Sequence, residues 1–303
     1  MISYLVALLT FGAIYALLAL GLNLMWGIAG MVNLGILGYY ALGGYSSALL
    51  TMHLGIPVWL GVIAGALITA LFGAATCIGL VKLRDDYLAI VTLGFAEVMR
   101  NIAENFVSLT NGTDGLAQIP RPRLGVTGSD FNVVYLVICV MVVLVVLAAM
   151  ERLRAAPFGR VLRALRADPM VAASAGKNVL GFQVRTLAVG GFVLGLGGAL
   201  YAHYLTYISP EVFQPQLMIY VFLALILGGR GNNYGAVLGT VLVLAIVEGT
   251  RFLADLVHGL DAVQIGALRA FVIGVAFIVV LQKRPHGLLP EPRRIYTDPA
   301  ARS

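Results

Sequence analysis

Long apolar segments dominate the pattern of the chain, and short stretches with charges or with Gly, Pro and Asn separate them. Most segments approach the ~20 residues that a helix needs to cross the hydrocarbon core of a bilayer. Residues 26–45 contain six glycines, so a broken or re-entrant helix is expected there and the span count lies between eight and ten. The pattern predicts nine membrane helices, at residues 2–25, 31–52, 57–80, 87–109, 131–150, 186–207, 216–229, 235–254 and 263–282.

Composition supports the bilayer as the solvent of this chain. Hydrophobic residues make up 60% and charged residues 11%, and the first charged side chain is Lys82. A soluble domain needs a more polar surface than this composition supplies. We therefore predict an all-α polytopic membrane protein with one domain over residues 1–303, whose first helix is a retained anchor because no basic segment precedes it.

The basic residues are distributed unevenly between the two sets of loops. Residues 82–86, 151–185 and 230–234 and the tail 283–303 hold 15 of the 20 Lys and Arg residues, whereas the opposite loops hold only Arg121 and Arg123. Cytoplasmic loops carry the excess of positive charge. This bias places the C-terminus in the cytoplasm and, with nine spans, the N-terminus in the periplasm.

Small residues and turn formers predict two further features. Residues 110–130 are rich in Gly and Pro, which indicates an irregular periplasmic loop that caps the bundle or docks a partner. Glycines four residues apart allow helices to approach closely in one bundle. These pairs are Gly61 with Gly65, Gly191 with Gly195, and Gly235 with Gly239.

The cytoplasmic loop 151–185 contains two helical patterns of different character. In residues 158–166 an arginine recurs every third position opposite aliphatic side chains, which is typical of a helix on an interface; its arginines contact either anionic lipid or a partner protein. In residues 168–176, Asp168 is a favoured N-cap, Pro169 suits the first helical position and Gly176 suits the left-handed C-terminal position. The second pattern predicts a self-capped short helix, either a connector or an element that inserts into a groove on another protein.

Charged residues within predicted spans are functional candidates because a charge at mid-bilayer costs roughly 2.5–3.5 kcal/mol. Glu97, Arg100 and Glu104 share one helix face, so they either neutralise one another or line a path through the membrane. Arg269 has no acidic neighbour on its own helix, and a partner such as Glu248 or Glu97 is a hypothesis. The candidates for a translocation path are Glu97, Arg100, Glu248, Arg251 and Arg269.

Several functional classes are disfavoured. The basic residues adjoin apolar runs, where they set orientation, so nucleic-acid binding is not expected. Asp85-Asp86 lacks the third carboxylate of a diphosphate site, and the four histidines lack metal or triad spacing, which argues against a membrane enzyme or a metal site. An ion-coupled secondary transporter would show inverted repeats, and the sequence contains no convincing internal repeat. The sequence has no phosphate-binding Gly-x-x-x-x-Gly-Lys-Ser/Thr loop, so ATP hydrolysis by this chain is not expected.

The segment PFGRVLRALRAD at 157–168, followed by Ala172, Gly176 and Asn178, resembles the cytoplasmic loop of branched-chain amino-acid ABC permeases and looks like their LivM branch. The resemblance spans nearly the whole chain in order. It includes LRDDYLAIVTLGF at 83–95, GGALYA at 197–202, Ser209-Pro210, GGRG at 228–231 and RPHGL at 284–288.

The resemblance implies the ABC importer permease fold and a transport subunit that is not an enzyme. It implies two ATPase subunits that bind ATP and Mg²⁺, a second, LivH-like permease subunit, a periplasmic binding protein and a place in the bacterial inner membrane. The implied substrates are branched-chain or other aliphatic amino acids, with urea or short amides as alternatives. The family carries Glu where this chain has Met170. The implied coupling residues are Asp168, Pro169, Met170, Val171, Ala172, Ala173 and Gly176.

Overall fold

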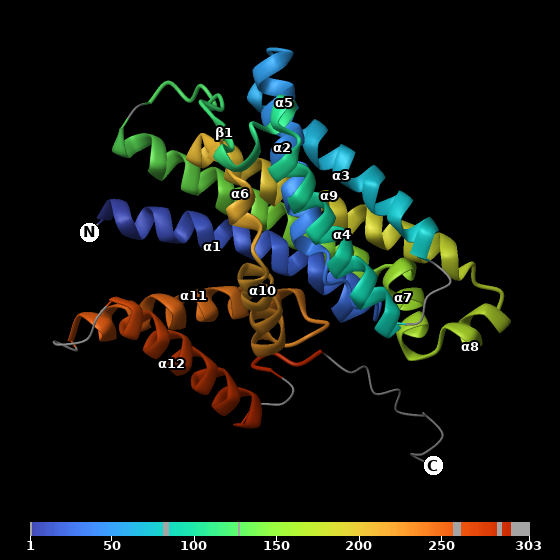
Figure 1. Ribbon diagram of the computed structural model, residues 1–303. Coiled ribbons are helices and arrows are strands. Elements are labelled where there is room, and N and C mark those ends of the chain that lie inside the picture. Colours follow the sequence, from blue (N-terminus) through green and yellow to red (C-terminus); the bar gives the residue numbers. More distant parts are fainter. Residues whose placement is uncertain (1, 81–84, 127, 257–261, 284–286, 292–303) are drawn as a thin grey trace.

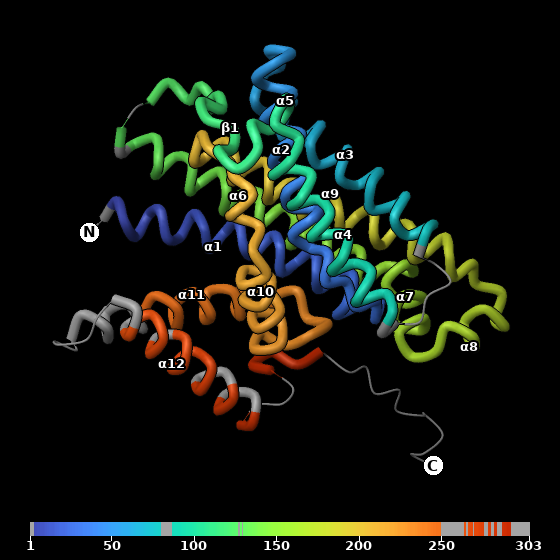
Figure 2. Tube along the Cα trace, in the orientation of Figure 1, coloured from blue at the N-terminus to red at the C-terminus, as the bar shows by residue number. Residues whose placement is uncertain are grey.

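The computed structural model describes residues 2–80, 85–126, 128–256, 262–283 and 287–291 (Figures 1 and 2). Within them the chain is almost entirely helical. The long helices are α1 (Ile2–Leu22), α2 (Ile36–His53), α3 (Val58–Leu80), α4 (Asp85–Asn105), α6 (Ser129–Ala155), α9 (Val179–Leu205), α10 (Pro215–Gly228), α11 (Asn233–Leu256) and α12 (Ala262–Lys283). The short elements are η1 (Asn23–Ile28), α5 (Val107–Thr110), η2 (Gly112–Asp114), β1 (Leu116–Ala117), α7 (Pro157–Ala167), α8 (Pro169–Ser174), β2 (Tyr207–Ile208) and η3 (Pro210–Phe213).

Each of the nine predicted spans overlaps one of these long helices, which confirms the all-α polytopic class. The fourth span, predicted to end at residue 109, ends at Asn105, and α5 follows as a separate turn. Among the described residues, four helical segments are long and apolar enough to cross a membrane on their own composition: Ser3–Ile28, Val58–Gly79, Asp130–Ala155 and Val179–Leu205. Shorter apolar helices occur at Pro215–Gly228, Asn233–Gly249 and Gly266–Val275. The chain is therefore a multi-pass membrane protein.

Helix α9 lies at the centre of the bundle and packs most extensively against α3 and α2, and next against α1 (Figure 1). Glycine makes this approach possible. A Cβ on Gly198 would lie 1.9 Å from the carbonyl oxygen of Tyr40, and one on Gly195 would lie 2.4 Å from the Thr69 hydroxyl. A Cβ on Gly239 would likewise lie 1.9 Å from the carbonyl oxygen of Ala224, where α11 meets α10. The predicted role of small residues in close helix contact is confirmed.

The first predicted break in the helical pattern is confirmed, but it lies earlier than the glycines suggested. Helix α1 ends in the π-helical turn η1, and residues 29–35 are not helical, so the second span begins at Ile36 and not at residue 31. The irregular segment is held by protein: Thr92 Oγ1 accepts from the Leu34 N–H at 3.0 Å, and Asn33 Oδ1 accepts from the Gly35 N–H at 2.8 Å. Residues 36–53 form one continuous helix, because Gly43 and Gly44 serve contact with α9 and do not break the chain.

The predicted irregular loop 110–130 is pinned to the bundle. Strand β1 pairs antiparallel with β2, with Leu116 opposite Ile208, so this loop and the segment before α10 form one unit. The buried His203 side chain lies beneath it, with Nδ1 2.8 Å from the Pro120 carbonyl oxygen and Nε2 2.9 Å from Ser47 Oγ. Because a carbonyl can only accept, Nδ1 carries a hydrogen, and in the neutral form of the ring Nε2 then accepts from the Ser47 hydroxyl.

Candidate coupling loop and translocation path

The predicted helix with an aliphatic and a basic face is present as α7, and its aliphatic face packs on the bundle of this chain. Leu162 and Leu165 are buried. The expected contacts of its arginines were lipid or a partner protein, but two of the three arginines bond to this chain. Arg163 donates to the Arg154 carbonyl oxygen at 3.1 Å, and Arg166 bonds within the chain as described below, whereas Arg160 is exposed. The arginine stripe is thus largely an intramolecular anchor.

Helix α8 has caps at both ends, as its sequence predicted. Asp168 Oδ1 accepts from the N–H groups of Met170 at 2.7 Å and Val171 at 3.2 Å. At the other end Gly176 has φ +74°, its N–H donates to the Ala173 carbonyl, and the Lys177 N–H donates to the Ala172 carbonyl at 3.1 Å. This pair of bonds is the Schellman arrangement. A helix of six residues keeps its shape through these caps and not through its length.

The predicted coupling residues are brought together at this helix, but they do not share one environment. Met170 is 80% exposed and Val171 63% exposed, whereas Ala172 is buried against the chain. Asp168, Pro169, Ala173 and Gly176 are exposed. Exposed apolar side chains of this size on a short, rigid helix form a surface that a protein groove can cover. Ala172 is therefore not part of the exposed surface of α8. It packs against the rest of the chain.

Arg166, immediately before α8, connects three separate parts of the chain. Its guanidinium donates to the Gly27 carbonyl oxygen in η1 and forms an ion pair with Glu291 at 2.6 Å. The segment that carries Glu291 is itself bonded to the end of α10, because the Leu288 and Leu289 N–H groups donate to the carbonyl oxygens of Leu227 and Gly228 at 2.8 and 2.9 Å. Arg166 thus links the residues just before α8 to the broken end of α1 and, through the Glu291 segment, to the end of α10.

A second set of polar contacts runs beside Arg166 at the same end of the bundle. Asn23 in η1 donates to Asn233 Oδ1 at 2.9 Å and accepts from the Gly231 N–H at 2.9 Å; Asn233 donates to Glu151 at 3.0 Å, and Glu151 pairs with Arg154. Sequence reasoning did not single out these residues. The signal that could have found them is Asn23, which lies at the end of an apolar span. A polar side chain at that depth needs hydrogen-bond partners.

The cluster on α4 has the geometry that its spacing predicted. Arg100 forms ion pairs with both Glu97 and Glu104, and Asn101 donates to the Glu97 carboxylate at 3.2 Å. The Glu97 side chain is nearly half exposed. The predicted ion pairing within the cluster is confirmed, and one guanidinium for two carboxylates leaves one negative charge in excess. A membrane helix turns such an exposed polar face toward protein or water and not toward lipid. This face of α4 therefore remains a candidate for the translocation path.

The remaining candidates lie on α11 and α12. Glu248 accepts a hydrogen bond from the Tyr4 hydroxyl of α1 at 2.5 Å. The side chains of Arg251 and Arg269 lie outside the described residues, as does most of the predicted tail 283–303, so the pairing proposed for Arg269 remains a prediction.

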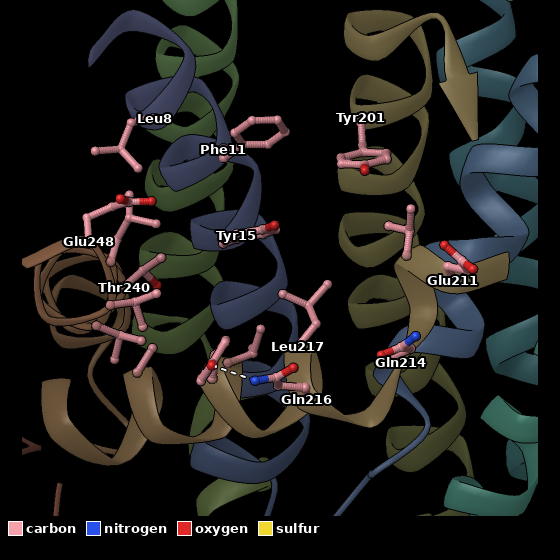
Figure 3. Close-up of a pocket in the computed structure, with 17 residues that line it drawn as sticks. Leu8, Phe11, Tyr15, Tyr201, Glu211, Gln214, Gln216, Leu217, Thr240 and Glu248 are labelled. Atoms are coloured by element: carbon pink, nitrogen blue, oxygen red, sulfur yellow. Dashed lines mark hydrogen bonds between the residues drawn. The ribbon is translucent and has the colours of Figure 1, made fainter. Parts of the chain in front are cut away.

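Glu248 also lines a cavity of about 400 Å³ between α1, α9, η3, α10 and α11. Figure 3 shows Glu248 on one side and Glu211 of η3 on the other, with the rings of Phe11 and Tyr201 between them. At its base the amide of Gln216 donates to the Tyr220 hydroxyl at 2.9 Å.

Comparison with known proteins agrees with this architecture. A sequence model of the family described as branched-chain amino acid transport system, permease component, matches residues 4–281. The permease LivM of Salmonella typhimurium is 30% identical over 94% of this chain and 69% of its own length. A probable LivM of Methanocaldococcus jannaschii is 28% identical over 96% of this chain and 94% of its own length. LivH of Salmonella typhimurium is 29% identical over 93% of each chain.

No solved structure is significantly similar to the chain. The family match covers every long helix of the bundle through most of α12, together with the capped cytoplasmic helix and the broken first span. The function of the family is transport, not catalysis, and ATP hydrolysis belongs to separate ATPase subunits. The chain belongs to the family of branched-chain amino acid transport system permease components.

Proposed function

We propose that this chain is the transmembrane permease subunit of an ATP-driven importer for branched-chain or other aliphatic amino acids in the bacterial inner membrane. The observation that carries the proposal is the α7–α8 loop. It contains a short helix, capped at both ends, that exposes Met170 and Val171, and Arg166 ties it to the end of α1 and, through Glu291, to the end of α10. A subunit without its own ATP site needs such a contact to receive work from an ATPase.

In this mechanism α8 is the coupling helix and sits in a groove of an ATPase subunit. Closure of the ATPase pair around ATP and Mg²⁺ displaces α8. Arg166 passes this displacement to η1 and, through Glu291, to the end of α10. A π-helical turn beside a non-helical segment is a suitable place for α1 and α2 to change their relative position, since few helical hydrogen bonds have to break there. No cofactor is required in this chain.

A second, LivH-like permease subunit would complete the path. The similarity of the chain to both LivM and LivH relatives supports a pair of related permeases. The polar face of α4, with Glu97 and Arg100, and the Glu248 side of α11 are the surfaces that we assign to the path; Arg251 and Arg269 are further candidates. A periplasmic binding protein would deliver substrate to residues 110–130 and 208–216, which the β1–β2 pair joins.

The excess of basic residues in the loops before α4, between α6 and α9 and after α12 supports a cytoplasmic C-terminus and a periplasmic N-terminus. In this orientation α8 and Arg166 face the ATPases, while η3 and the β1–β2 pair face the binding protein.

The test is reconstitution of the chain with its co-purifying subunits and binding protein in proteoliposomes, with ATPase activity and uptake of labelled leucine as readouts. Leucine uptake that requires both ATP and the binding protein is the expected result. Active ATPase without leucine uptake would redirect the substrate to urea or short amides, which the same vesicles can test. Failure to recover any ATPase subunit would reject the importer function.

A further inference from the structure

We propose that the cavity between α1, α9, η3, α10 and α11 is a transit site that holds the ammonium group of the substrate, with the Glu248 carboxylate as its principal contact. The inference rests on the proposed import function. The volume of about 400 Å³ falls in the range of roughly 300–1,000 Å³ for small-molecule sites. It accommodates a single amino acid together with water.

The cavity lining combines negatively charged side chains with an apolar wall. Among the side chains that the structure describes, Glu211 and Glu248 are the charged residues of this lining, and neither Lys nor Arg contributes to it. Such a site attracts a cation. Among the described residues, no three His, Cys, Asp or Glu side chains are grouped to hold a metal ion, so an organic ammonium group fits this pair better than a metal does. The apolar wall, which accepts an aliphatic side chain, comprises Leu8, Phe11, Leu217, Val221, Val243 and Leu244.

Polar groups at the first turn of α10 complete a site for a zwitterion. Gln214 is the N-cap residue of this 14-residue helix, and it lines the cavity together with Gln216. Amide side chains beside the positive end of a helix dipole favour a carboxylate. A crevice filled with lipid tails would not carry two carboxylates and two amides, because Tyr4 and Tyr220 satisfy only part of their hydrogen-bonding capacity and the rest would lack water.

Glu248 is held in position by a neighbour that leaves it able to bind. The Tyr4 hydroxyl donates to Oε2 at 2.5 Å, and an ionised carboxylate has about four acceptor positions. Glu211 lies on η3, directly after the β1–β2 pair that joins the two outer loops. Glu211 and Glu248 therefore lie on opposite sides of the cavity, with Glu211 next to the outer loops (Figure 3).

The test introduces a thiol by Leu244→Cys, one turn before Glu248 on the same helix, in the complete complex in proteoliposomes. Its reaction with cationic methanethiosulfonate ethylammonium and with the anionic ethylsulfonate is followed by mass spectrometry of the peptide that contains position 244. Thr113→Cys, on an exposed part of the outer loop, is the matched control for intrinsic reagent reactivity. Leucine and 4-methylpentanoate, which lacks the amino group, are then tested as protectants.

We expect the cationic reagent to react at least about fivefold faster at position 244 than the anionic one, relative to the control, and Glu248→Gln to remove most of this preference. Leucine should slow the reaction, 4-methylpentanoate should not, and Glu248→Gln should lower leucine uptake about tenfold, since a hydrogen bond to a charged group is lost.

Equal reagent rates at position 244, with normal leucine uptake by Glu248→Gln, would overturn the site and leave the import function intact. A retained cation preference and protection by leucine in a complex that imports no leucine would instead support the site and reject the import function. Leucine protection that survives Glu248→Gln would also overturn the assignment of the ammonium contact.

Discussion

The surface of α8 makes the sharpest prediction. In docking to an ATPase groove, the area available for burial is that of Met170, 80% exposed, and Val171, 63% exposed. Complete burial of a side chain of this kind stabilises by about 1.5–3 kcal/mol. Scaled by these exposed fractions, truncation of both side chains costs about 3 kcal/mol of docking free energy, which corresponds to more than a hundredfold weaker binding.

The double variant Met170→Ala, Val171→Ala isolates this effect. The backbone N–H groups that donate to Asp168 remain, and Ala is the best helix former, so α8 should keep its shape. Recovery of ATPase subunits with the purified permease is the primary assay, and leucine uptake is the second. Ser174→Ala is the matched control, because it changes an exposed residue of the same helix without removing apolar area.

Undiminished recovery of ATPase subunits and normal uptake in the double variant would refute the argument that these side chains form the docking surface. Ala172→Arg would be a poorer test, because Ala172 is buried and a large charged side chain would disturb packing within the permease itself.

Three further variants test the local geometry. Asp168→Ala removes the N-cap acceptor and should destabilise α8 by about 1 kcal/mol, with reduced uptake that Asp168→Asn largely restores. Arg100→Gln leaves two glutamates without their cation and should lower the thermal unfolding temperature of the solubilised permease, an effect that neutralising both glutamates reverses. Gly198→Ala places a Cβ 1.9 Å from the Tyr40 carbonyl oxygen and should destabilise by at least about 1–3 kcal/mol in the same assay, whereas Gly94→Ala, with open space around it, should not. Unchanged melting of Gly198→Ala would contradict the close packing of α9 against α2.

The capped helix α8 was predicted almost completely because its determinants are local. An N-cap, a proline at the first position and a C-terminal glycine act within one or two turns, and the structure forms the corresponding hydrogen bonds. The ion pairs on α4 were predictable for the same reason, because residues three and four apart share a helix face.

The contacts of Arg166 were not predictable in this way. They join residues more than 100 positions apart, Gly27 and Glu291, and depend on where α7 lies across the ends of α1 and α10. The inward orientation of Ala172 also depends on this packing, since neighbouring residues of a six-residue helix with similar apolar character do not differ in local pattern.

The sequence by itself determined the class of the protein, the position of nearly every membrane helix and the capped helix of the cytoplasmic loop. Hydrophobic length and capping are local properties that any segment expresses wherever it lies in the fold. Only the tertiary structure decided how the charges and polar groups are paired across helices, that the outer loop is joined to the segment before α10, and that Glu211 and Glu248 line one cavity. These relations depend on long-range packing: the glycines of α9 set how closely the helices approach, and a sequence pattern does not specify which distant faces then meet.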